Sequence, residues 1–239
     1  MAATLAATMG RASAANTPGV TATEVKIGNT MPYSGPASAY ASIGRGEAAY
    51  FKMLNEAGGI DAHKVNFISL DDSYSPPKTV EDVRRLVEQE RVDFLFQCLG
   101  TPCNSAIQRY CNQRKVPQLF VASGASKWNN PKKYPWTMGW QPSSRTEAQI
   151  YMKYLLQEKP DAKLGIIYQN DDFGKDYYAG AKDVLGDKFS KIAVKVVTYE
   201  VTDPTIDSQL AQLKSSGADA WLVAAPPKFA AQAIRKVHN

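Results

Sequence analysis

The sequence predicts an α/β protein made of two similar units, each built on a doubly wound, mostly parallel sheet. Short apolar runs alternate with segments of helical periodicity from residue 25 to residue 122, and the same alternation restarts at residue 144. Between them, residues 127–142 show no periodicity and contain three tryptophans and four prolines or glycines. Such a composition is typical of a connection, so we expect the chain to cross from one unit to the other near residues 139–143.

The first unit contains four expected strands, at residues 25–28, 65–70, 92–96 and 118–122. Helices are expected between them, over residues 43–57, from residue 75 and over residues 104–114. The first helix carries apolar residues at helical spacing, among them Tyr50 and Met53, and Gly58-Gly59 ends it. Pro76 and Pro77 suit the first turn of the second helix.

The second unit repeats this rhythm. Ser144 and Glu147 have the spacing of a capping box and predict a helix start. The expected strands are residues 163–168, 192–199 and 220–223. Helices are expected over residues 175–185, from Asp203-Pro204 to Gly217, and from residue 228 to the end. Residues 91–96 and 218–223 are also similar, since each places an Asp before a bulky apolar strand.

The turn Gly100-Thr101-Pro102 is the first candidate for a binding site. It follows a buried strand and precedes a helix, so it presents unpaired backbone N–H groups and the positive end of the helix dipole at the carboxyl end of a parallel sheet. Ligands collect at this edge of α/β sheets, and anions suit such a turn. The Thr101 hydroxyl adds a donor there, although a simple strand–helix loop capped by Thr101 explains the same residues.

Composition excludes several classes of protein. The chain has 239 residues, 44% of them hydrophobic, and a net charge of +5 that is spread out, so no basic block of the kind that binds nucleic acid occurs. No run of 18 apolar residues, the length needed to span a membrane, occurs in the sequence. Cys98, Cys103 and Cys111 lack the spacing of a metal site, and we expect buried free thiols, with a Cys98–Cys103 bridge as the alternative.

The N-terminus is rich in Ala, Thr and Ser. Ala12-Ser13-Ala14 resembles the small-residue cleavage site of a secretory signal, although no basic segment precedes it. We expect residues 1–22 to be the remnant of a signal peptide or a disordered leader, and the protein to be exported to the periplasm.

Several motifs together resemble the type I periplasmic binding proteins, in particular the branched-chain-amino-acid-type receptors of ABC importers. They run in order from about residue 24 to the end of the chain. The matching segments are residues 27–28, 32–37, 55–60, 70–72, 99–102, 121–125, 168–174 and 213–220. The helix end Asn-Glu-Ala-Gly-Gly-Ile at 55–60 and the Asp-Phe-Gly loop at 172–174 make the match specific.

The resemblance implies a first lobe over residues 23–141 and a second, incomplete lobe over residues 142–239, with a small solute bound between them by hinge closure. It places Tyr40 and Phe173 against the solute from opposite sides. The turn at Thr101 and the loop containing Ala122, Ser123 and Gly124 would hold the carboxylate and amino groups of the solute. Partners would be a carboxylate solute and a membrane permease, with no cofactor or metal.

Two departures from the family concern the solute. The family's acidic residue that pairs with an amino group lies late in the second lobe, beyond Asn239. The loop after Val223 is Ala224-Ala225-Pro226-Pro227-Lys228, without the expected aromatic or polar residue. A branched-chain or other amino acid and an organic or aromatic acid without an amino group therefore stay open.

Two other functions compete with solute transport. A ligand-sensing receptor domain of the same fold would use the same residues. An enzyme would need a nucleotide-binding or nucleophile motif, yet Gly44-Arg45-Gly46 lacks the third glycine of the dinucleotide fingerprint and no G-x-S-x-G sequence occurs. The pair Asp171-Asp172 has no nearby His or Glu and suits loop capping better than a metal or acid–base site. We therefore expect binding without catalysis.

Overall fold

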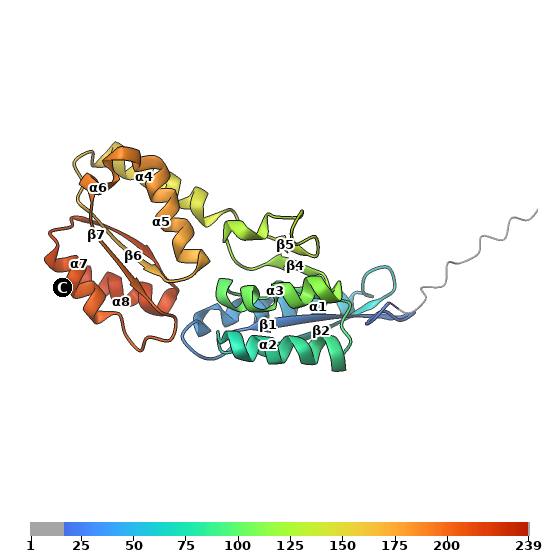
Figure 1. Cartoon of the computed structure of the whole chain (residues 1–239). Coiled ribbons are helices and arrows are strands. Elements are labelled where there is room, and N and C mark those ends of the chain that lie inside the picture. Colours follow the sequence, from blue (N-terminus) through green and yellow to red (C-terminus); the bar gives the residue numbers. More distant parts are fainter. Residues whose placement is uncertain (1–16, 239) are drawn as a thin grey trace, which may run out of the picture.

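The computed structural model describes residues 17–238, which form two α/β lobes joined end to end (Figure 1). Most of the expected leader therefore lies outside the described residues. Val20, which the sequence assigns to that leader, pairs with Val25 in an antiparallel bridge. Among the described residues, no helix combines the length and the apolar composition needed to cross a membrane.

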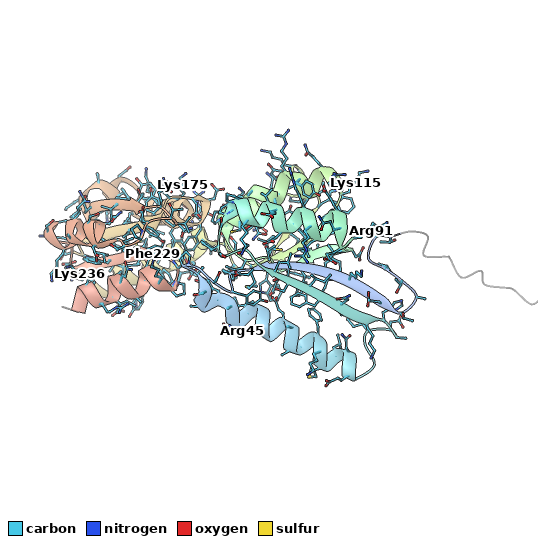
Figure 2. All side chains as sticks on the ribbon, turned by 90° about the horizontal axis from the view of Figure 1, so that it is seen from below. Arg45, Arg91, Lys115, Lys175, Phe229 and Lys236 are labelled. Carbon is cyan, nitrogen blue, oxygen red and sulfur yellow. The ribbon has the colours of Figure 1, made fainter. Side chains whose placement is uncertain are left out.

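The first lobe contains a parallel sheet of five strands in the order β2-β1-β3-β4-β5. Its strands are β1 (Glu24–Met31), β2 (Lys64–Asp71), β3 (Phe94–Phe96), β4 (Gln118–Val121) and β5 (Thr137–Gly139). Helices α2 (Pro76–Arg84) and α3 (Thr101–Arg114) cover one face, and α1 (Ala41–Glu56), marked by Arg45, covers the other (Figure 2). A short π-helical turn (Arg85–Gln89) extends α2, and single 3-10 turns occupy Ser38–Tyr40 and Ser126–Trp128. The doubly wound parallel sheet is confirmed.

The buried face of α1 differs from the expected one. Tyr50 and Met53 are more than half exposed, whereas Ala41 and Gly44 are buried. A Cβ at Gly44 would lie 2.4 Å from the Tyr33 hydroxyl oxygen, so the missing side chain leaves room for the Tyr33 ring against the helix. The sheet-facing side of α1 is therefore formed by small residues at its start and by Phe51, whose ring centroid lies 5.2 Å from that of Phe67 and 5.6 Å from that of Phe96.

The second lobe has a parallel sheet of three strands in the order β7-β6-β8. These strands are β6 (Leu164–Gln169), β7 (Ala193–Tyr199) and β8 (Ala220–Ala224). The helices are α4 (Ser144–Glu158), α5 (Asp172–Leu185), α6 (Phe189–Ile192), α7 (Asp207–Ser215) and α8 (Pro227–His238), with a 3-10 turn at Gly186–Lys188. Ile167 and Phe229 lie fully buried in its core.

One strand and three helix starts differ most from the sequence prediction. β5 lies inside the stretch expected to be a connection and pairs with β4. Helix α3 begins at Thr101 and helix α5 begins at Asp172, each three residues before the expected start. Helix α7 begins only at Asp207, because Asp203 is held in the preceding turn, where its carboxylate accepts a hydrogen bond from the Glu200 N–H at 2.9 Å.

Candidate ligand-binding cleft

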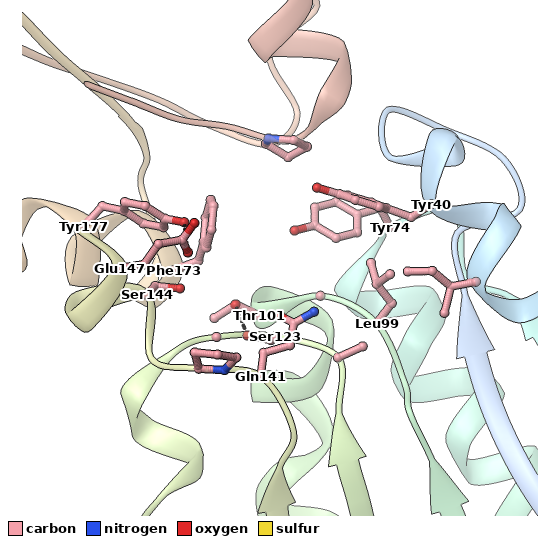
Figure 3. A pocket seen from close by; sticks show the side chains of 16 residues that line it. Tyr40, Tyr74, Leu99, Thr101, Ser123, Gln141, Ser144, Glu147, Phe173 and Tyr177 are labelled. Atoms are coloured by element: carbon pink, nitrogen blue, oxygen red, sulfur yellow. Dashed lines mark hydrogen bonds between the residues drawn. The ribbon is translucent and has the colours of Figure 1, made fainter. Parts of the chain in front are cut away.

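A cavity of about 460 Å³ lies between the two lobes (Figure 3). Its lining combines the carboxyl-end loops of the first sheet with the first turns of α4 and α5 from the second lobe. The six residues predicted for the site all line it: Tyr40, Thr101, Ala122, Ser123, Gly124 and Phe173. The structure thus brings together loops that are more than 130 residues apart in the sequence; that these six bind a ligand stays a prediction.

The floor of the cleft is the start of α3. Gly100, just before it, has φ 99°, and a Cβ there would lie 2.4 Å from the ring of Tyr74. Glycine is therefore required both by the backbone and by the aromatic ring that closes over it. Among residues 17–238, no acceptor is paired with the N–H groups of Thr101 and Gly124. These amides and the positive end of a 14-residue helix favour a negative charge in the cleft.

A chain of hydrogen bonds orients the Thr101 hydroxyl. Thr101 Oγ1 and Ser123 Oγ lie 2.5 Å apart, and Ser123 Oγ also accepts from the indole N–H of Trp128 at 2.8 Å and from the backbone N–H of Ala125 at 3.3 Å. A hydroxyl oxygen has two lone pairs, and these two donors occupy both. Ser123 must therefore donate its own hydrogen to Thr101, which leaves the Thr101 hydroxyl hydrogen free for a ligand.

Aromatic side chains form the walls. Tyr40 and Tyr74 stand on the first-lobe side, and Phe173 and Tyr177 face them from α5 (Figure 3). The rings of Phe173 and Tyr177 meet edge to face, with centroids 5.2 Å apart. Such walls supply apolar area for the rest of a ligand and neutral hydroxyls at its edge.

Tyr74 was not predicted as a site residue. Its backbone has φ 59°, and the buried carboxylate of Asp72 holds this turn by accepting from the Tyr74 N–H and from the Thr79 hydroxyl, both at 2.9 Å. Burial raises the pKa of Asp72 although both hydrogen bonds lower it. The Tyr74 hydroxyl accepts a 3.5 Å hydrogen bond from the Gln169 side chain of the other lobe. The sequence signal that could have indicated this position is Asp71-Asp72 at the end of a strand.

Glu147 is a second missed residue, and the capping box predicted for it is wrong. Ser144 lies inside α4, and no side chain caps the first turn of that helix. Instead the Glu147 carboxylate accepts hydrogen bonds from the hydroxyls of Tyr177, at 2.5 Å, and Tyr151. Glu147 therefore lines the cleft. Gln141, Pro142, Ser144 and Pro226 complete the parts of the lining that sequence reasoning did not find.

The carboxylate pair Asp171-Asp172 behaves as expected. Asp171 is the N-cap of α5, and its carboxylate accepts from the Gly174 N–H at 3.1 Å. No group of three or more His, Cys, Asp or Glu side chains is placed to hold a metal ion within residues 17–238. Cys98, Cys103 and Cys111 are buried and unbridged, as predicted, and burial raises the pKa of all three thiols.

Besides the Gln169–Tyr74 hydrogen bond, two contacts hold the lobes together beside the cleft. The carboxylate of Asp176 accepts from the backbone N–H of Ser126 at 2.6 Å and from its hydroxyl at 2.9 Å. One turn earlier in α5, Asp172 pairs with Lys127 at 2.7 Å. Both contacts join the loop that follows the Ser123–Gly124 bend to the turn that carries Phe173. Both contacts therefore join the lobes close to the predicted site residues Ser123, Gly124 and Phe173.

Comparison with known proteins identifies the family. Residues 24–239 match the family described as "Periplasmic binding protein". A relative named Leu/Ile/Val-binding protein homolog 1, from Brucella abortus, is 24% identical over 200 residues, which are 81% of this chain and 52% of that protein. The chain spans about half the length of the curated relatives it matches.

Solved structures share the fold. The fatty acid ABC transporter substrate-binding protein of Thermomonospora curvata has a TM-score of 0.78 at 22% identity, covering 92% of this chain and 56% of that chain. A solute-binding protein of an ABC transporter from Rhodopseudomonas palustris BisB5, in complex with 3,4-dihydroxybenzoic acid, has a TM-score of 0.72 at 18% identity, covering 90% and 58%. The chain belongs to the periplasmic binding protein family, and its two parallel sheets are those of the type I, branched-chain-amino-acid-type members.

Proposed function

We propose that this chain is the extracytoplasmic solute-binding component of an ABC importer and that it binds a small carboxylic acid between its lobes without converting it. The observation that carries the proposal is the floor of the cleft. There the Thr101 hydroxyl hydrogen, two unpaired backbone N–H groups and the start of α3 are available to one negatively charged group.

The relatives support the same chemical class. The names of the three proteins compared above mention Leu/Ile/Val, a fatty acid and 3,4-dihydroxybenzoic acid. A carboxylate is the group that these compounds share. The rest of each ligand differs. A common acid-binding floor with variable walls accounts for this range, and Tyr40, Tyr74 and Phe173 would be the walls in this chain.

Binding would close the cleft, with a boundary near residues 141–142 between the moving lobes. The Ser126–Asp176 and Lys127–Asp172 contacts join the lobes in the closed form and would break on opening. A solute that touches both lobes favours the closed form by the difference between its contacts in the two states. A permease would then recognise the closed form, and export to the periplasm would bring the two together.

Native mass spectrometry and isothermal titration calorimetry test the proposal. The purified protein is titrated with aliphatic, aromatic and amino-substituted carboxylic acids and with the matching amides, which lack the charge. We expect at least one acid to bind, its amide to bind at least tenfold more weakly, and the bound compound to be recovered unchanged. Binding of amides and acids with equal affinity would overturn the acid-binding floor, and turnover of the compound would overturn the assignment as a receptor.

A further inference from the structure

We infer that Glu147 is the specificity-determining residue of this cleft and that it selects acids bearing a second group that donates a hydrogen bond, an ammonium or a hydroxyl. The inference rests on the proposed function, because it requires that a carboxylate occupies the Thr101 floor. The inference goes beyond the proposed function because it separates acids that carry a second donor from acids whose remainder is entirely apolar.

The first argument is the charge of the lining. Among the residues that line the cavity, Glu147 is the one carrying a carboxylate, and none is a lysine, arginine or histidine. A bound acid therefore meets neutral donors on the floor and a negative charge beside Phe173 and Tyr177 (Figure 3). A ligand with only one charged end would offer no donor to the acceptor positions of this carboxylate that face the cleft. A ligand that carries a donor would supply the missing hydrogen bond to the Glu147 carboxylate.

The second argument is how Glu147 is held. Tyr151 donates to Oε1 and Tyr177 donates to Oε2, so the carboxylate is clamped from both sides. Each carboxylate oxygen has two lone-pair positions, and each tyrosine occupies one. The hydrogen bonds to Glu147 also raise the pKa of Tyr151 and, together with burial as the larger cause, that of Tyr177. Both tyrosines therefore stay donors, and a free acceptor position remains on each oxygen.

The third argument is position. Glu147 lies in the first turn of α4 in the second lobe, whereas Thr101 and Gly124 belong to the first. A ligand with an acid group at the floor and a donor at Glu147 would touch both lobes with polar groups. The sequence gives no such role to Glu147, because a capping box with Ser144 explains its spacing. The structure removes that explanation and leaves the side chain facing the cleft.

Two matched series of ligands test the inference. The first is phenylalanine, phenyllactate and phenylpropanoate, and the second is leucine, leucate and isocaproate. Within each series the acid and the carbon skeleton are constant, and the neighbouring substituent is ammonium, hydroxyl or hydrogen. Dissociation constants are measured by calorimetry on the full chain, for the wild type, for Glu147→Gln and for Glu158→Gln. Glu158 is an exposed carboxylate on the same helix and serves as the control.

In at least one series we expect the member with a donor to bind at least tenfold more tightly than its hydrogen counterpart, which is about 1.4 kcal/mol. Glu147→Gln should abolish the preference for ammonium and reduce that for hydroxyl, while Glu158→Gln changes neither. If Glu147→Gln does not fold, Tyr177→Phe, which removes one clamp, should lower the preference at least threefold.

If, in both series, the wild type binds phenylpropanoate and isocaproate as tightly as their ammonium and hydroxyl counterparts or more tightly, the role of Glu147 is overturned and the acid-binding floor is left standing. Retention of the preference in Glu147→Gln would overturn it as well. If no acid of either series or of the wider panel binds, the proposed function fails and the inference fails with it.

Discussion

Replacing Thr101 by Val tests the floor of the cleft most directly, because valine keeps the shape of threonine and removes only its hydroxyl. Thr101 is 3% exposed, and its oxygen lies 2.5 Å from Ser123 Oγ. Ser123 already accepts from Trp128 and Ala125, so in the variant the Ser123 hydrogen has no acceptor. The unmet buried donor costs about 1–3 kcal/mol. For a chain of this length, that lowers the melting temperature by about 2–10 °C.

The effect on ligand binding is separate. The wild-type hydroxyl hydrogen is free to donate to a bound carboxylate, and a hydrogen bond to a charged group contributes about 1.5–3 kcal/mol. We therefore expect Thr101→Val to weaken an acid by about 10- to 150-fold, with a smaller effect on the matching amide. Calorimetry gives the affinities, and Thr146→Val, at an exposed position of α4, is the control. An unchanged affinity for the acid in a folded Thr101→Val variant would refute the hydrogen-bond chain as an acid-binding device.

Two further predictions concern the lobes and the response to pH. Lys127→Ala removes the ion pair with Asp172, and because such exposed pairs contribute about 0.2–1 kcal/mol, the population of open molecules should rise up to about fivefold. Small-angle X-ray scattering of the free protein should then give a larger radius of gyration, and Lys132→Ala should not; equal radii for both variants would show that the pair does not restrain the lobes. Burial raises the pKa of Glu47 from 4.5 to about 7, so between these values the folded protein holds a proton that the unfolded chain has released, and stability falls as pH rises through this window. The free energy of unfolding, measured with urea from pH 4 to 8, should depend less on pH in Glu47→Gln than in the wild type. An equal pH dependence in the two proteins would contradict the raised pKa of Glu47.

The sequence was sufficient for the seven strands that it predicted and for the long helices between them, because alternating strand and helix patterns leave few topologies open to a parallel sheet, whereas β5 and α6 were missed. The six residues predicted for the site line one cavity because the fold brings the carboxyl ends of its strands and the starts of the following helices together, and their role in binding stays a prediction. The start of α3 was wrong by three residues because Thr101 and Pro102 have no apolar periodicity, although proline suits a first helical turn.

Other features depend on side-chain contacts that the alternation of strands and helices does not reveal. Tyr74 reaches the cleft because the buried carboxylate of Asp72 holds a left-handed turn. Glu147 faces the cleft because two tyrosines, one from its own helix and one from α5, bind it more closely than any backbone N–H of its helix does. β5 is only three residues long and exists through pairing with β4. Tyr177 and β4 are distant in the sequence from their partners, whereas Asp72 and Tyr151 are close to theirs and no strand or helix pattern indicates their contacts.

The hydrogen bond from Trp128 to Ser123 gives the protein an optical reporter of its own cleft. The Trp128 indole is 2% exposed and bonded to a residue of the cavity lining, whereas Trp136 and Trp140 are 36% and 61% exposed. Iodide in solution would quench the emission of the two exposed indoles and spare that of Trp128. Trp221 of β8 is the fourth tryptophan and is partly buried, so Trp221→Phe would be needed to remove its emission. In that variant the remaining fluorescence would follow events at the Ser123 bend without any attached dye.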